Sequence, residues 1–110
     1  MLRILGMLGA VLLSTHVMAI EGEGDPVLGK QKAYTCQFCH GETGHTPKKD
    51  YPHINGQNAL YLYNVMKSYQ AGERTGAMGN MMRQQMSVLS DQDIKDIAAF
   101  YANQKRGKPE

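Results

Sequence analysis

The longest stretch of apolar positions lies near the beginning of the chain. Residues 4–13 form an almost unbroken apolar run after Arg3, and Val17-Met18-Ala19 follows as a small-x-Ala cleavage pattern. This order is typical of a secretory signal peptide, and a run of about ten residues is half the roughly 20 that a membrane span needs. We therefore predict a cleaved signal peptide at residues 1–19 and export to a bacterial periplasm. An uncleaved N-terminal anchor is the alternative.

Two later segments repeat their apolar residues at the spacing of one helix face. The first has such residues at 62, 65, 66 and 69, with Asn58 as its candidate cap and an end near Gly72. The second has them at 94, 97, 98 and 101, and Lys105-Arg106-Gly107 suits its end. Ser90 and Asp93 have the spacing of a capping box before this second helix.

The remaining segments give weaker signals. Asp25-Pro26 is typical of a helix start and predicts a helix from Val27 towards Cys36. Residues 36–56 and 73–80 are rich in glycine and predict loops, with a short helical segment after the second. No alternation typical of strands is present, so the sequence predicts an all-α fold of three to four short helices, with residues 20–110 as one domain.

Composition shows that this domain is poor in ordinary core residues. Residues 20–110 include 33 apolar residues, but only 13 of them are Leu, Ile, Val or Phe. That is below the roughly 20% that marks chains short of core-forming residues. The charges are balanced, with 12 Lys and Arg against 10 Asp and Glu, which argues against a nucleic-acid binder. The chain is foldable, but something besides its side chains is expected to fill the interior.

One short motif carries recognisable chemistry: Cys36-Gln37-Phe38-Cys39-His40. Three kinds of site use such a spacing. A thioredoxin-type redox pair needs a strand before it and a helix after it, and no strand is predicted here. A zinc site needs four ligands, which His45 or His53 could complete. Covalent attachment of haem c uses both thiols for the haem vinyl groups and the following histidine as an axial iron ligand. An exported, all-helical chain favours haem.

A haem iron with His40 on one side needs a second ligand on the other. Methionine there favours ferrous iron. The predicted mature chain has five methionines: Met66, Met78, Met81, Met82 and Met86. Met66 and Met86 fit core positions, whereas the other three lie in or next to a glycine-rich stretch where the backbone can approach a flat group. Spacing alone does not select the ligand.

Taken with these residues, the chain resembles the class I cytochromes c of the small bacterial single-haem type, and one half of the dihaem type. The resemblance extends from about Asp25 to Gln104. It rests on Gly29-Lys30 before the Cys-x-x-Cys-His-Gly motif, Pro52-His53-Ile54-Asn55-Gly56-Gln57, Tyr61-Leu62, Gly72-Glu73-Arg74, Leu89-Ser90-Asp91-Gln92-Asp93-Ile94 and Ile97-Ala98-Ala99-Phe100-Tyr101.

The resemblance implies roles for several residues. The axial methionine of this subgroup lies seven residues before the Leu89 position, which selects Met82, with Met81 as the alternative. The carbonyl of Pro52 would accept a hydrogen bond from His40. Arg74 would pair with a haem propionate. Gly29 would allow the last helix to cross the first closely, against Phe100 or Tyr101. His45 and His53 are minor alternatives as iron ligands.

The implied function is that of a periplasmic one-electron carrier. Iron held by both His40 and Met82 has no open coordination position, and no acid–base pair or nucleophile marks an enzyme site. We expect brief contacts of the haem edge with an oxidase, reductase or dehydrogenase, no nucleic-acid partner and no membrane insertion after cleavage. The alternatives are a haem subunit held tightly by a larger periplasmic oxidoreductase, a ligand-binding sensor or enzyme, and a domain without haem.

Overall fold

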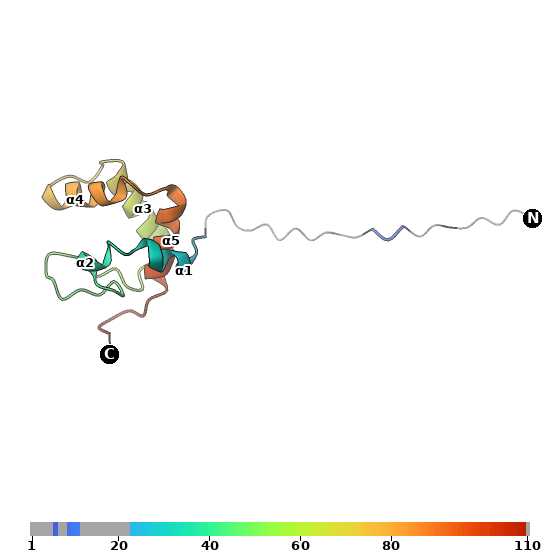
Figure 1. Ribbon diagram of the computed structural model, residues 1–110, viewed down its shortest axis with the longest axis horizontal. Helices are drawn as coiled ribbons and strands as arrows, with labels where there is room; N and C mark the ends of the chain where they lie inside the picture. The colour runs from blue at the N-terminus through green and yellow to red at the C-terminus, as the bar shows by residue number, and fades with distance from the viewer. Residues whose placement is uncertain (1–5, 7–8, 12–22, 110) are drawn as a thin grey trace, which may run out of the picture.

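The computed structural model describes residues 6, 9–11 and 23–109, and in this part of the chain all regular structure is helical. The five helices, shown in Figure 1, are α1 (Pro26–Lys32), α2 (Gln37–His40), α3 (Ala59–Gln70), α4 (Ala77–Met86) and α5 (Asp91–Ala102). The all-α prediction is confirmed. The predicted signal peptide lies outside the described residues except at 6 and 9–11, so its cleavage stays a prediction.

None of the helices in these ranges is long and apolar enough to cross a membrane.

Three helix starts follow the sequence signals. The Asp25 carboxylate accepts hydrogen bonds from two backbone N–H groups of the first turn of α1. The Asn58 side chain accepts from the Tyr61 backbone N–H at 2.9 Å and caps α3. Ser90 and Asp93 bond to each other's backbone N–H groups at 2.9 and 3.1 Å, which completes the capping box of α5. These caps were predictable because each depends only on residues within three positions of one another.

Two predictions about the first half of the chain were wrong in detail. The first helix ends at Lys32 rather than near Cys36, and the expected loop at 36–56 begins with the single turn α2. A helix of four residues is too short to show an apolar period, which is why the sequence did not reveal it. Gly41 ends α2 with a φ of 84°, a left-handed conformation that glycine adopts without strain.

Helix α4 is longer than predicted and includes part of the expected loop at 73–80. Gly79 had favoured a loop there, but it lies buried inside the helix. A Cβ atom at this position would lie 2.8 Å from the carbonyl oxygen of Arg74, so the preceding turn packs directly on the helix backbone. Gly79 therefore allows the Arg74 backbone to pack closely against α4, and it does not form a turn.

The centre of the fold is the crossing of α1 and α5, and α3 packs against both α5 and α4. In Figure 1, α4 lies at the top and α2 at the bottom left, with the α1–α5 crossing to their right. The crossing depends on Gly29, because a Cβ there would lie 1.9 Å from the carbonyl oxygen of Asp96 and 2.9 Å from the Cβ of Phe100. The expected close approach is confirmed, with Phe100 as the aromatic neighbour.

The core of the described chain is small. Its nine buried apolar residues are Ala33, Leu62, Met66, Met86, Ile94, Ile97, Ala98, Phe100 and Tyr101. The expected core positions of Met66 and Met86 are confirmed. Partly buried residues packed against this cluster include Cys36, Ile54 and Met82. The core therefore continues towards the cysteine motif and α4 without being closed there.

An ionic contact fastens α1 to α5. The Lys32 ammonium lies 2.6 Å from Asp96 and 2.9 Å from Asp93. Asp96 is almost completely buried, and its carboxylate also accepts from the backbone N–H of Asp25 and the side chain of Gln92. Burial alone would raise the pKa of Asp96, but these donors outweigh it and lower the pKa. The Lys32 ammonium, with the Ser90 donors, lowers the pKa of Asp93 to about 2.

These lowered pKa values predict loss of stability in acid. A carboxylate whose pKa is lower in the folded than in the unfolded chain stabilises the fold above its unfolded pKa. That stabilisation is lost as pH falls from about 4 towards about 2. Urea unfolding at pH 5, 4, 3 and 2 should therefore show a falling free energy of unfolding.

An Asp93→Asn variant should be less stable at pH 5 and depend less on pH in this range. Glu73→Gln changes an exposed acidic side chain and is the control. An unchanged pH profile in Asp93→Asn would refute this assignment.

Candidate functional site

The cysteine motif adopts one continuous helical turn. Cys36 has helical backbone angles, and its carbonyl accepts from the backbone N–H of Cys39 at 3.3 Å and of His40 at 2.9 Å. Side chains three and four residues apart on a helix lie on the same face. The structure thus brings both sulfurs and the imidazole to one side of a rigid turn.

The His40 ring is held in one orientation. It is buried, 8% exposed, and its Nδ1 lies 3.0 Å from the carbonyl oxygen of Pro52. A carbonyl can only accept, so Nδ1 carries a proton, and in the neutral tautomer with this arrangement the lone pair is on Nε2. A nitrogen in this state can bind a metal, and the hydrogen bond fixes the ring and increases its basicity. The contact with Pro52 that the sequence resemblance implied is present.

The loop around Pro52 is itself well fixed. The Ile54 backbone N–H donates to the carbonyl of Gly44 at 2.8 Å. The backbone N–H of Thr46 donates to Nδ1 of His53 at 3.0 Å, and the His53 ring stacks on His45 with centroids 3.9 Å apart. The two histidines therefore pair with each other and help hold the loop.

A zinc site with these histidines is not formed. In residues 23–109, no group of three or more His, Cys, Asp or Glu side chains is arranged to hold a metal ion. Stacked His45 and His53 do not join Cys36, Cys39 and His40 in such a group. Within the motif, His40 is therefore the one candidate ligand for iron, and it would be an axial haem ligand.

Both cysteines are free and partly buried. Burial raises the pKa of the Cys36 thiol, which favours the neutral form. Reactive redox cysteines have lowered pKa values instead, and the described chain has no strand before the motif. The surroundings thus argue against a thioredoxin-type pair. They suit an apolar group bonded to sulfur.

The methionines of α4 differ in their surroundings. Met82 is partly buried and packs against the core, and it is one helical turn from the fully buried Met86. Met78, a turn earlier, is 43% exposed. Met81 is also partly buried but is not among the residues that pack against the described core. Of the two candidate iron ligands, Met82 therefore lies on the inward face of α4.

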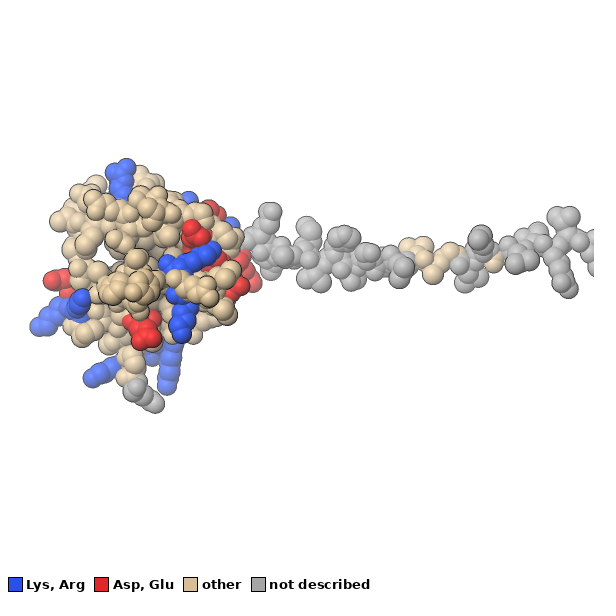
Figure 2. Space-filling model, viewed as in Figure 1, with Lys and Arg blue, Asp and Glu red and all other residues tan. Residues whose placement is uncertain are grey.

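Space for a flat group lies between α2 and α4. These helices do not pack extensively against each other, and the space-filling view shows an opening between the part of the surface containing α4 and that containing α2 (Figure 2). Cys36, Ile54 and Met82 continue the apolar core towards this side. The thiol of Cys36 just before α2, the thiol and the oriented imidazole on α2, and a thioether on α4 are the donors that a haem c needs. The residues present fit that group.

Several contributors to the site were not found from the sequence. The Lys48 ammonium donates to the carbonyl of Phe38 at 2.6 Å and ties the following loop to α2. Tyr51 lies beside His40, with ring centroids 6.2 Å apart, and the nearby sulfur of Cys39 raises its pKa. Neither residue follows a period or a motif, so only the folded loop reveals them.

Arg74, which the resemblance assigned to a propionate, has protein partners in this structure. Its Nε donates to the Ser68 hydroxyl at 3.0 Å, and its guanidinium lies 5.1 Å from the Tyr69 ring centroid. These contacts hold the connection between α3 and α4. The propionate contact stays a prediction.

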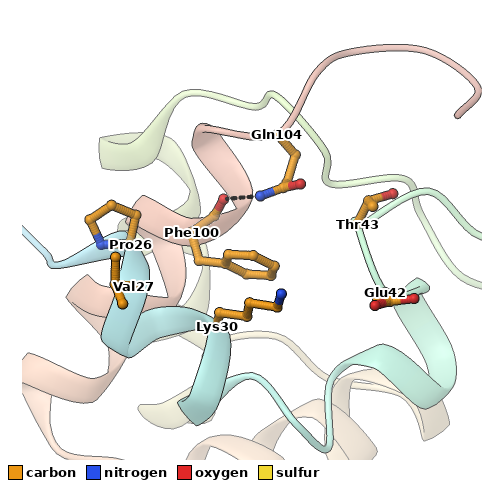
Figure 3. A pocket seen from close by; sticks show the side chains of 7 residues that line it. All are labelled: Pro26, Val27, Lys30, Glu42, Thr43, Phe100 and Gln104. Carbon is orange, nitrogen blue, oxygen red and sulfur yellow. Dashed lines mark hydrogen bonds between the residues drawn. The ribbon is translucent and has the colours of Figure 1, made fainter.

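A separate pocket of about 330 Å³ lies where α1 and α5 meet the loop after α2 (Figure 3). Its lining residues are Pro26, Val27, Lys30, Glu42, Thr43, Phe100 and Gln104. The Gln104 amide donates to the carbonyl of Phe100 at 3.1 Å, which closes one side. None of the motif residues lines this pocket, so it is distinct from the space between α2 and α4.

Comparisons with known proteins agree with this geometry. The family model described as cytochrome c matches residues 27–105. Cytochrome c-554(548) of Halomonas halodenitrificans is 42% identical over 82 residues, covering 74% of this chain and 99% of that protein. Cytochrome c4 of Pseudomonas aeruginosa is 40% identical over 100 residues, covering 90% of this chain and 48% of that protein.

A solved structure shows the same relation. Reduced recombinant cytochrome c4 from Pseudomonas stutzeri superposes with a TM-score of 0.66 at 35% identity, covering 74% of this chain and 46% of that one. The chain thus spans about half the length of its cytochrome c4 relatives and nearly all of cytochrome c-554(548).

Fold, motif and relatives together define a class I c-type cytochrome. The chain belongs to the cytochrome c family, and its fold is similar to one half of a dihaem cytochrome c4. Its cofactor is haem c, and like its relatives it is an electron-transfer protein rather than an enzyme.

Proposed function

We propose that this chain is a periplasmic one-electron carrier whose haem is bonded to Cys36 and Cys39 and whose iron is held by His40 and Met82. The observation that carries the proposal is the 3.0 Å contact from His40 Nδ1 to the Pro52 carbonyl, which leaves Nε2 free for iron on the face of α2 that also holds both sulfurs. The signal-peptide pattern at residues 1–19 supports the periplasm.

The roles of His40 and Met82 explain why we propose electron transfer. When bound, the haem supplies a one-electron ferric/ferrous couple. His40 is already oriented, so little rearrangement of this ligand accompanies electron transfer. The Met82 sulfur would be the second ligand of the iron, and a methionine ligand would favour the ferrous state. With His40 and Met82 as ligands, the chain would leave no coordination position for a substrate, which suits electron transfer.

Partners are expected to dock where the cofactor comes nearest to the surface. Phe38, between the two cysteines, is 57% exposed, and Met78 on α4 is 43% exposed. Exposed apolar groups beside the site suit the small, short-lived interfaces of electron transfer. A relative from Stutzerimonas stutzeri, 28% identical over 68 residues, is named a thiosulfate dehydrogenase electron acceptor. We infer that a dehydrogenase is one suitable donor, with an oxidase or reductase as acceptor.

Paired variants test the distal ligand. Met82→Ala should remove the weak long-wavelength ferric band expected of a methionine–iron bond and lower the reduction potential, because the thioether no longer favours ferrous iron. Met81→Ala, one position along α4, is the matched control and should keep the band. Visible spectroscopy of both ferric proteins decides between them. The opposite pattern would assign the iron to Met81 instead.

A further inference from the structure

Tyr101 on α5 presents an unexplained polar group in the middle of the core. The residue is 2% exposed, and its hydroxyl oxygen is buried without a hydrogen-bond partner among the described residues. Buried hydroxyls are normally paired, because an unpaired one gives up its hydrogen bonds to water without replacing them. The unpaired hydroxyl therefore points to an acceptor that forms only when the cofactor is attached.

The ring cannot turn away to find water. A Cβ at Gly44 would lie 2.8 Å from the Cδ1 atom of Tyr101, so the loop after α2 packs directly on one edge of the ring. The Gly56 backbone N–H donates to the Tyr101 carbonyl at 2.8 Å and fastens the next part of that loop to α5. The phenol is therefore clamped between α5 and the loop that orients His40.

The cysteine motif borders the part of the core that contains Tyr101. Cys36 packs against the core cluster to which Tyr101 belongs. Burial, followed by the nearby Cys36 sulfur, raises the pKa of Tyr101, so the phenol keeps its proton. A protonated hydroxyl next to a sulfur atom can serve as a hydrogen-bond donor.

Attachment of haem changes what that sulfur can do. The thiol adds across a vinyl group: a sulfur–carbon bond forms, the thiol proton passes to the other vinyl carbon, and no electrons are gained or lost. The resulting thioether has lone pairs and no proton, so it can only accept a hydrogen bond. Tyr101 then becomes the donor of the pair.

We propose that Tyr101 is a positioning residue for the haem, whose hydroxyl donates a hydrogen bond to the Cys36 sulfur in its thioether form. The bond would fix the Cys36 side of the cofactor and place the positive end of the hydroxyl dipole next to it. That field favours the more electron-rich ferrous state. This inference rests on the proposed attachment at Cys36.

The test uses the holoprotein and Tyr101→Phe, which keeps the ring and removes only the hydroxyl. Haem attachment is first verified by the absorbance of the alkaline pyridine complex, which distinguishes two thioether bonds from one. Resonance Raman spectra then give the carbon–sulfur stretching bands in H₂O and D₂O, and a redox titration gives the potential. The matched control is Tyr63→Phe, which removes a hydroxyl that donates to the Asp91 carboxylate at 2.5 Å.

We expect the wild-type carbon–sulfur band to shift in D₂O, and the shift to be absent in Tyr101→Phe and retained in Tyr63→Phe. Tyr101→Phe should also have a lower potential and an unfolding equilibrium constant about fivefold higher, as loss of a buried hydrogen bond predicts. An unchanged band and potential, with equal or greater stability, would mean that the hydroxyl stays unpaired and would overturn the proposal. A wild-type protein without a thioether at Cys36 would instead refute the proposed attachment.

Discussion

Replacing both Cys36 and Cys39 with alanine should leave residues 20–110 largely unfolded. The described chain buries nine apolar residues, too few to stabilise a domain of this length without help. The core continues towards the space between α2 and α4 through partly buried residues such as Ile54 and Met82. A covalently bound haem would complete this core, so its loss exposes the interior from one side.

Far-ultraviolet circular dichroism and urea titration of this double variant measure the effect. We expect most of the helical signal to disappear, with no cooperative transition. Met82→Ala is the control, because it loses one iron ligand but keeps the attached haem, and it should remain folded. A double variant with native-like helicity and a cooperative transition would show that the side chains alone are enough to stabilise the fold without haem.

Gly29→Ala should have the second largest effect. An alanine Cβ would lie 1.9 Å from the backbone carbonyl oxygen of Asp96, and neither backbone can give way without separating α1 from α5. Overpacking in a core costs roughly 1 to 3 kcal/mol, and a clash with backbone belongs at the upper end, about 3 kcal/mol. The displaced α5 would also disturb the buried contact of Lys32 with Asp96.

Urea unfolding of the holoprotein gives this number directly. Gln31→Ala, at an exposed position of the same helix, is the control and should change the free energy of unfolding by less than about 0.5 kcal/mol. If Gly29→Ala proves as stable as wild type, then the α1–α5 crossing does not require a residue without a Cβ at position 29.

The parts of the fold that local chemistry controls could be predicted from the sequence. The starts of α3 and α5 depend on Asn58 and Ser90, whose side chains bond within three residues of themselves. Helix α2 is too short to show an apolar period, and the full length of α4 depends on tertiary packing. Gly79 is inside α4 because the Arg74 backbone packs on it, and no local signal reports that packing.

The site shows the same division. The two cysteines and His40 stand out because covalent attachment needs a fixed spacing, and the contact with Pro52 came from family resemblance. The Lys48 contact with Phe38 and the buried hydroxyl of Tyr101 join residues far apart in sequence. A single sequence holds no pattern that pairs them, so only the folded chain places them beside the motif.

We propose that the protein fills both axial positions of the iron, which makes the chain an electron carrier rather than a ligand-binding sensor. Visible spectra of the reduced holoprotein at neutral pH, before and after addition of carbon monoxide, test this most directly. We expect the sharp α band of a six-coordinate c-type haem, unchanged by the gas. Rapid carbon monoxide binding with loss of that band would contradict it.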